Sequence, residues 1–242
     1  MSETVHTGGP TGHEPASPPL VTPPPVIPSV SGPSQRPDDP IDPWISIWSR
    51  PRATLRHILE TDPRRGVYRL AALGGISGCL SGARQPGFGD TYPVPMVLVA
   101  ALLGGVIAGV VGIQIGAALI GMTGRWLGGR GGRTEVMAAL AWANVPAAWG
   151  LALWLPRAAL LGGETFQALP VSLEGNPPAA LLFMMLQGLE VVVALWGLVI
   201  LLKCVAEAHG FTAWRAFLAL VLMILVLAAP FFLIAFLGLL VR

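Results

Sequence analysis

Glu190 is the residue whose position most calls for a chemical explanation, because it interrupts an apolar run. No other charged residue lies between positions 181 and 202. If this run crosses a bilayer, an ionised carboxylate at its centre costs on the order of 2.5–3.5 kcal/mol on insertion scales. Glu190 should therefore face other helices, be protonated, or both. Gln187 lies one helical turn earlier, on nearly the same face.

Two further polar side chains, Gln114 and Asn144, lie in other apolar runs and reach a similar depth when counted from the predicted cytoplasmic ends. We therefore predict one mid-membrane polar cluster of Glu190, Gln187, Gln114 and Asn144. The cluster has two interpretations. It is either a proton or solute site, or a set of hydrogen bonds between helices that contribute about 0.6–2 kcal/mol each. We favour the second interpretation.

The runs that carry these residues are typical of membrane helices. The chain is 53% hydrophobic and 12% charged, whereas soluble domains are about 25% charged. About 20 apolar residues span the roughly 30 Å core of a bilayer. The predicted fold class is all-α, a polytopic membrane bundle of five transmembrane helices preceded by short interfacial helices and a disordered N-terminal tail. The expected spans lie at about 67–84, 94–123, 135–156, 178–203 and 214–241.

The first of these spans is the shortest, because its uncharged core covers only residues 70–83. The distribution of charge favours it nevertheless. With five spans, 12 of the 15 Lys and Arg residues lie on one side of the membrane, and Arg84, Arg157 and Arg242 lie on the other. Because basic residues concentrate on the cytoplasmic side, the N-terminus is predicted to be cytoplasmic and the C-terminus outside. The excess of Arg over Lys suggests a prokaryotic cytoplasmic membrane.

Glycines recur along two of the expected spans. Gly105, Gly109, Gly112 and Gly116 share one helical face, and residues 74–82 form a GxxxGxxxG series. Small residues let membrane helices approach closely. These faces predict packing within the bundle or between copies in a homo-oligomer; a pore-lining or hinge role is the alternative.

Proline residues suggest two interruptions. Pro146 in the third span and Pro230 in the fifth each remove a backbone donor, so both predict a kink. Asn144 is then placed to accept or donate a hydrogen bond near the first kink.

A short amphipathic segment precedes the first span. Asp42 suits an N-cap and Pro43 the first helical position. Trp44 and Trp48 share an apolar face that can lie at the lipid headgroups or dock on the bundle. Residues 1–41 form a Pro-rich tail that we expect to be disordered and cytoplasmic. The candidate interfacial or partner contacts are Trp44, Trp48, Arg50, Pro51, Arg52, Arg125, Arg130 and Arg133.

The sequence offers little that could catalyse a reaction. The Gly-rich turn 128–132 lacks the phosphate-loop spacing. The histidines are scattered, and the two cysteines lie in apolar segments without a CxxC pair. A net charge of +2 is too small to indicate a nucleic-acid partner. We therefore expect no metal, no cofactor, no nucleic acid and no enzymatic activity, and the expected partners are the lipid bilayer and another protein or a second copy.

The segment that begins at Asp42 reads DPWISIWSRPRAT, and DP occurs again at positions 62–63. With RWLGG from Arg125, AWANVP from Ala141 and AHGFTAWRA from Ala208, this order of motifs resembles the Yip1-domain family over about residues 42–242. The resemblance implies five membrane helices and a cytosolic N-terminus. Eukaryotic members are linked to vesicle trafficking and Rab GTPases; for bacterial-type members the resemblance implies no established activity.

The sequence predicts two alternative functions. The first is a non-enzymatic membrane protein of the Yip1-domain type that binds a partner or organises the membrane. The alternative is a small-solute or ion transporter or channel subunit that uses Glu190. The two differ in an observable, since a water-accessible cavity that reaches Glu190 favours transport and a closed bundle with a hydrogen-bonded Glu190 favours the first.

Overall fold

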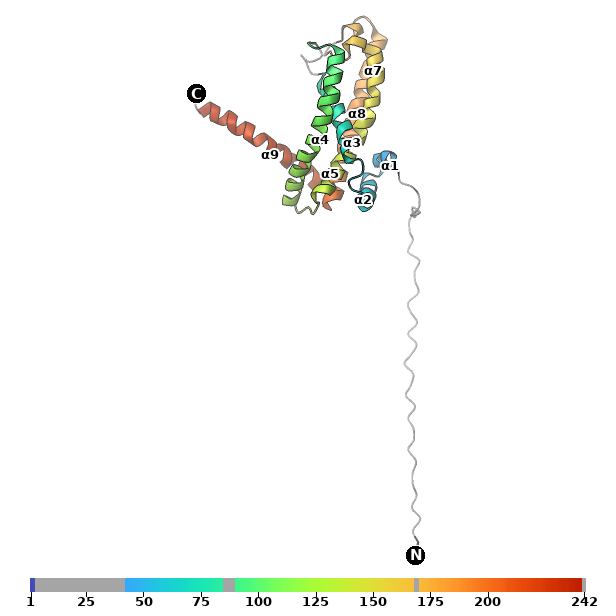
Figure 1. Ribbon diagram of the computed structural model, residues 1–242, viewed down its shortest axis with the longest axis vertical. Coiled ribbons are helices and arrows are strands. Elements are labelled where there is room, and N and C mark those ends of the chain that lie inside the picture. Colours follow the sequence, from blue (N-terminus) through green and yellow to red (C-terminus); the bar gives the residue numbers. More distant parts are fainter. Residues whose placement is uncertain (3–41, 85–89, 168–169, 241–242) are drawn as a thin grey trace. The chain divides into compact units, whose positions relative to one another are not determined.

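The computed structural model describes residues 1–2, 42–84, 90–167 and 170–240, which contain helices and no strand (Figure 1). The chain divides into two units, Met1–Asp39 and Pro40–Arg242, and the described helices all belong to the second unit. The predicted disorder of the tail lies outside the described residues, apart from its first two positions. The predicted all-α membrane bundle is confirmed.

The helices are joined by short connections. In chain order they are α1 (Pro43–Ser49), α2 (Pro51–Thr61), α3 (Val67–Gly82), α4 (Val94–Trp126), α5 (Arg133–Trp142), α6 (Val145–Gly150), the 3₁₀ turn η1 (Leu151–Leu153), α7 (Trp154–Leu161), the 3₁₀ turns η2 (Gly162–Glu164) and η3 (Val171–Leu173), α8 (Pro177–His209) and α9 (Ala213–Leu240).

Within the described part of the chain, four segments are long and apolar enough to cross a membrane, where the sequence predicted five spans. They are Val94–Trp126, Arg133–Glu164, Pro177–His209 and Ala213–Gly238. The first predicted span is α3, which has 16 residues and a length of about 24 Å. It is therefore shorter than the roughly 20 residues that a bilayer core requires.

The short helix α3 packs closely along α4, and glycine makes this possible (Figure 1). A methyl group added at Gly75 would lie 2.6 Å from the backbone nitrogen of Gly109 and would also strike the carbonyl of Gly105. The predicted glycine face of α4 is thus divided. Gly105 and Gly109 contact α3, Gly116 faces Leu140 of α5, and Gly112 faces open space.

The amphipathic segment docks on the bundle through part of its apolar face, and Trp44 and Ile45 remain exposed. Asp42 caps α1 by accepting a hydrogen bond from the Trp44 backbone N–H at 3.0 Å. Ile47 of α1 and Leu55 of α2 are fully buried in a core that includes residues of α3, α5 and α8. Trp44 lies edge-on to Trp142 of α5, with ring centroids 6.3 Å apart.

The third predicted span is broken where Pro146 removes a backbone donor. The α-helix stops at Trp142, residues 143–144 form a turn, and α6 then carries Pro146 in its first turn. In contrast, α9 remains helical through Pro230. Almost none of the most apolar stretch of α9 is buried, and its C-terminal half leaves the bundle (Figure 1).

Candidate functional site

Glu190 forms two ion pairs inside the bundle. Its Oε2 lies 2.7 Å from Nη1 of Arg84, and its Oε1 lies 3.0 Å from Nη1 of Arg157. The side chains of Glu190, Arg84 and Arg157 are 18%, 20% and 4% exposed, respectively. Because removing one partner of a buried pair leaves an uncompensated charge, the three groups depend on one another.

A fourth polar side chain and an aromatic ring complete this ionic cluster. The Gln187 carbonyl oxygen accepts hydrogen bonds from Arg84 at 3.1 Å and Arg157 at 3.3 Å. Both guanidiniums also lie over the ring of Trp154, 5.6 and 5.8 Å from its centroid. The face of the Trp154 ring and the Glu190 carboxylate together stabilise the two neighbouring guanidinium charges. We name Arg84, Arg157, Gln187 and Glu190 the ionic cluster.

Three elements bring the cluster together at one end of α3. Arg84 comes directly after the last turn of α3, Arg157 lies on α7, and Glu190 lies on α8. Glu207 lies near the C-terminal end of α8, 17 residues after Glu190, which is a distance of about 26 Å along the helix. The cluster therefore lies well away from the arginine-rich end of the bundle.

The structure brings together some of the predicted polar residues and separates another. Glu190 and Gln187 share the ionic cluster. Asn144 packs against Gly74 and lines the same cavity as Glu190. The Gln114 amide instead donates to the Tyr68 hydroxyl at 3.2 Å and accepts from Arg133 at 2.8 Å. The separation arises because α4 has 33 residues and Gln114 lies level with Tyr68, in the first turn of α3.

The two arginines of the cluster were not among the predicted site residues. The charge distribution in the sequence assigned Arg84 and Arg157 to the outer side of the membrane and did not indicate their partners. A signal was present, since these were the two basic residues on the predicted outer side that precede the final helix. Their pairing with Glu190 depends on how α3, α7 and α8 pack, which no local pattern specifies.

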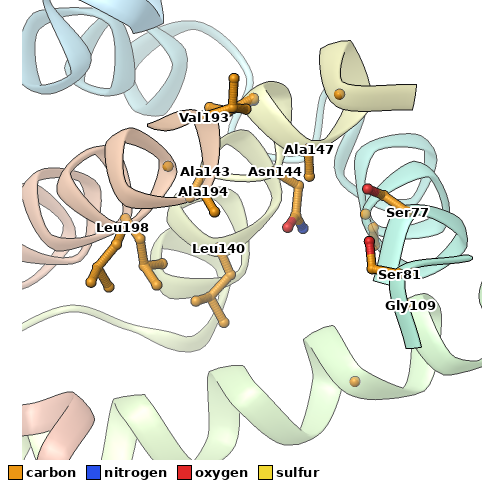
Figure 2. A pocket seen from close by; sticks show the side chains of 18 of the residues that line it. Ser77, Ser81, Gly109, Leu140, Ala143, Asn144, Ala147, Val193, Ala194 and Leu198 are labelled. Atoms are coloured by element: carbon orange, nitrogen blue, oxygen red, sulfur yellow. The ribbon is translucent and has the colours of Figure 1, made fainter. Parts of the chain in front are cut away.

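A cavity of about 810 Å³ extends from the ionic cluster into the bundle. Figure 2 shows Asn144 in this space between α3, which carries Ser77 and Ser81, and α8, which carries Ala194 and Leu198. The lining of the cavity combines the charged and amide groups of Arg84, Glu190 and Gln187 with a mainly apolar remainder. Its apolar lining includes Ile113, Ile120, Leu140, Leu198, Leu201, Leu220 and Met223.

At the arginine-rich end of the bundle, polar contacts join α2 to the last turns of α8 and to the turn that follows it. Arg56 lies 2.7 Å from Glu207, and Arg52 donates to the carbonyl of Phe211 at 3.2 Å. Trp196 of α8 donates its indole N–H to the carbonyl of Trp48 at 3.1 Å. These contacts fix α1 and α2 as part of one surface.

The predicted contact residues occupy different places on this surface. Pro51 is buried, and Arg52 and Arg133 each donate a side-chain hydrogen bond within the bundle. Arg130 lies in the turn after α4, and its backbone N–H donates to the carbonyl of His209 at 3.1 Å. The exposed basic side chains at this end are Arg50, Arg52, Arg56, Arg64, Arg65, Arg69, Arg125, Arg130, Arg133 and Arg215.

The glycines of turn 128–132 have a packing role. The His209 ring is buried and stacks on Phe211 with centroids 5.1 Å apart. A methyl group added at Gly124 or Gly129 would lie 2.5 or 2.6 Å from an atom of that ring. The backbone of this turn therefore closes over the imidazole, and glycine is required for that approach.

We expect Gly124→Ala to destabilise the protein by about 1–3 kcal/mol, because the added methyl group overpacks the His209 site. Adding His209→Ala to that variant should recover part of the loss, a coupling that thermal unfolding in detergent can measure. Gly121→Ala is the matched control, since its methyl group would make an ordinary 3.5 Å contact. Equal losses in the two glycine variants would contradict this prediction.

These observations define a polytopic α-helical membrane protein with an internal ionic cluster. Residues 45–236 match the Yip1 domain. The chain therefore belongs to the Yip1 domain family, as the sequence motifs indicated. No curated protein and no solved structure matches it.

Proposed function

We propose that this protein is a non-enzymatic membrane protein that binds an acidic protein partner at its arginine-rich, cytoplasmic end. The observation that carries the proposal is the docking of α1 and α2 on α8 and on the turn that follows it. Because buried Ile47 and Leu55 anchor the two helices, the backbone positions of Arg50, Arg52 and Arg56 are fixed before a partner binds. Preorganisation of this kind reduces the entropic cost of binding.

The proposed orientation rests on two sets of contacts on α8. Val67, the first residue of α3, lies in the buried cluster that also holds Ala208 near the end of α8. Arg84, which follows the end of α3, contacts Glu190, and Glu190 is about 26 Å from Glu207 along α8. That distance is close to the roughly 30 Å of a bilayer core. We therefore infer that α3 crosses the membrane as a short fifth span. With five spans, the distribution of basic residues favours a cytoplasmic N-terminus and an outer C-terminus. The excess of Arg over Lys supports the cytoplasmic membrane of a prokaryote as the location.

We expect the double variant Arg50→Glu/Arg130→Glu to lose about tenfold or more in partner capture, since charge reversal at a rim mainly weakens electrostatic association. Both side chains are exposed. The measurement is crosslinking and pull-down of the full chain from native membranes, combined with a salt titration of the captured complex. Point variants are preferable to a deletion of residues 42–62, because that deletion would also remove buried core residues such as Ile47 and Leu55.

The matched control is Arg50→Lys/Arg130→Lys, which preserves the charge and should retain most of the capture. If charge reversal leaves capture and its salt dependence unchanged, the arginine-rich end is not the contact surface. A third outcome is that the natural chain captures no protein but binds vesicles of anionic lipid, and that the charge-reversed variant loses this vesicle binding. That outcome would instead indicate a role in membrane organisation.

The second candidate function is transport of a small solute or ion. The cavity of about 810 Å³ that reaches Glu190 favours it. The two ion pairs of Glu190 favour a structural role for the same carboxylate. Proton flux through proteoliposomes, compared between the natural chain and Glu190→Gln, separates the two.

A further inference from the structure

We propose that the cavity beside the ionic cluster binds an anionic amphiphile, with the acidic headgroup at Arg84 and the hydrocarbon part along the apolar lining. The class of ligand is a phospholipid with a net negative headgroup. This site lies at the opposite end of α3 from the arginine-rich surface, and it does not depend on partner binding there.

The charge of the cluster is the first support. Arg84 and Arg157 contribute two positive charges and Glu190 one negative charge, so the three side chains carry a net charge of +1. Arg84 lines the cavity, whereas Arg157 is almost fully buried behind it. A net positive charge that faces a cavity within a membrane protein attracts an anion, because little water is present to screen it.

The hydrogen bonds of the cluster point the same way. Each guanidinium has about five N–H donors, so the two can donate about ten hydrogen bonds. Their described acceptors are the Glu190 carboxylate and the Gln187 carbonyl oxygen. Nε of Arg157 is buried without a hydrogen-bond partner among the described residues. The cluster therefore has more donors than acceptors. Both hydrogen bonds given for Arg84 come from its Nη1, and a phosphate oxygen is an acceptor that its guanidinium can bind in bidentate geometry.

The shape of the cavity selects an amphiphile over a free anion. Along α8 its lining extends from Gln187 to Leu201, which is about 21 Å. Ser77, Ser81 and Asn144 contribute polar groups to this lining, and aliphatic side chains make up most of the rest (Figure 2). A volume of about 810 Å³ falls within the range of small-molecule sites, which are also mostly apolar with a few placed polar groups. A small inorganic anion would leave the apolar part unfilled.

The test uses the full chain, purified in detergent and stripped of lipid, with binding measured by native mass spectrometry. The probes are phosphatidylglycerol, phosphatidylcholine with the same acyl chains, and inorganic phosphate. We expect phosphatidylglycerol to bind on the order of fivefold or more tightly than phosphatidylcholine, the factor that one unscreened arginine gives toward an anionic lipid. Phosphate alone should not compete.

Two substitutions should move the lipid preference in opposite directions. Arg84→Gln makes the cluster neutral and should abolish the preference for phosphatidylglycerol, whereas Glu190→Gln raises its charge to +2 and should strengthen that preference. Arg84→Lys, which keeps the charge, should retain part of it and guards against loss of folding in Arg84→Gln. A change of the same sign in the two glutamine variants would overturn the proposal, as would an equal affinity of the natural chain for both lipids.

Two leucine substitutions on α4 test the hydrocarbon part of the site. Gly112 lines the cavity and a methyl group there meets nothing within 4 Å, so Gly112→Leu should fill the space and weaken binding of both lipids several-fold. Gly104 is equally open but does not line the cavity, so Gly104→Leu should leave binding unchanged. Equal effects of the two variants would contradict an acyl chain in this cavity. Competition by phosphate alone would show a free-anion site and overturn the amphiphile.

Discussion

Replacing Glu190 by Leu is expected to destabilise the protein by about 3–5 kcal/mol, because two guanidiniums then share a largely buried site without a counter-charge. The loss should appear as a lower midpoint in a reversible SDS titration in mixed micelles. Glu190→Gln should lose less, since an amide oxygen still accepts one of the two arginine hydrogen bonds.

A second Glu–Arg pair provides the matched control. Glu207 is 14% exposed and pairs at 2.7 Å with Arg56, whose side chain is 63% exposed, against 4% for Arg157. Because Glu207→Leu leaves the exposed Arg56 to be solvated by water, it should change stability by only about 0–1 kcal/mol. Similar losses in Glu190→Leu and Glu207→Leu would show that burial of the arginines does not set the strength of the ionic cluster.

The Glu190→Gln variant also bears on function. If it folds and supports the same proton flux and the same partner capture as the natural chain, a required ionisable role of Glu190 is excluded. If only the flux is lost, the transport function is supported and the structural interpretation of the cluster is insufficient.

Helices and their ends were largely predictable from the sequence, because each depends on local patterns. The apolar runs predicted α4, α8 and α9, Asp42 predicted the start of α1, and Pro146 predicted the break between α5 and α6. The docking of α1 and α2 on the bundle was not predictable. It depends on contacts with α5 and α8, more than 70 residues away in the sequence.

The site was predictable in part for the same reason. The energetic cost of a charge in an apolar run identified Glu190, and helical spacing added Gln187. Depth counted from helix ends misplaced Gln114, because the ends of α4 and α3 lie at different levels. The ion-pair partners of Glu190 were missed, because counting the basic residues on each side of the membrane does not show which side chains contact one another.

The close packing of α3 on α4 leads to the second large prediction. We expect Gly109→Leu to destabilise the protein by about 3 kcal/mol or more, at the upper end of overpacking effects. Even a methyl group at Gly109 would lie 2.7 Å from the carbonyl carbon of Ala71 and 3.2 Å from the Cα of Ala72. These are backbone atoms that no rotamer change can move, so the two helices must separate. Because α3 is short, it gains little from lipid contact and depends on this packing.

Reactivity of Cys204 provides a direct readout of this separation. Cys204 is fully buried in the core that α3, α4 and α5 share, and the chain's other thiol, Cys79, can be removed as Cys79→Ser. In that background, Gly109→Leu should lower the temperature at which Cys204 reacts with a small alkylating reagent. Gly104→Leu places the same side chain on the same helix at an open position, and it should leave the temperature nearly unchanged. Equal shifts would mean that added bulk on α4 acts through the lipid, and the glycine contact would not be what holds α3 in place.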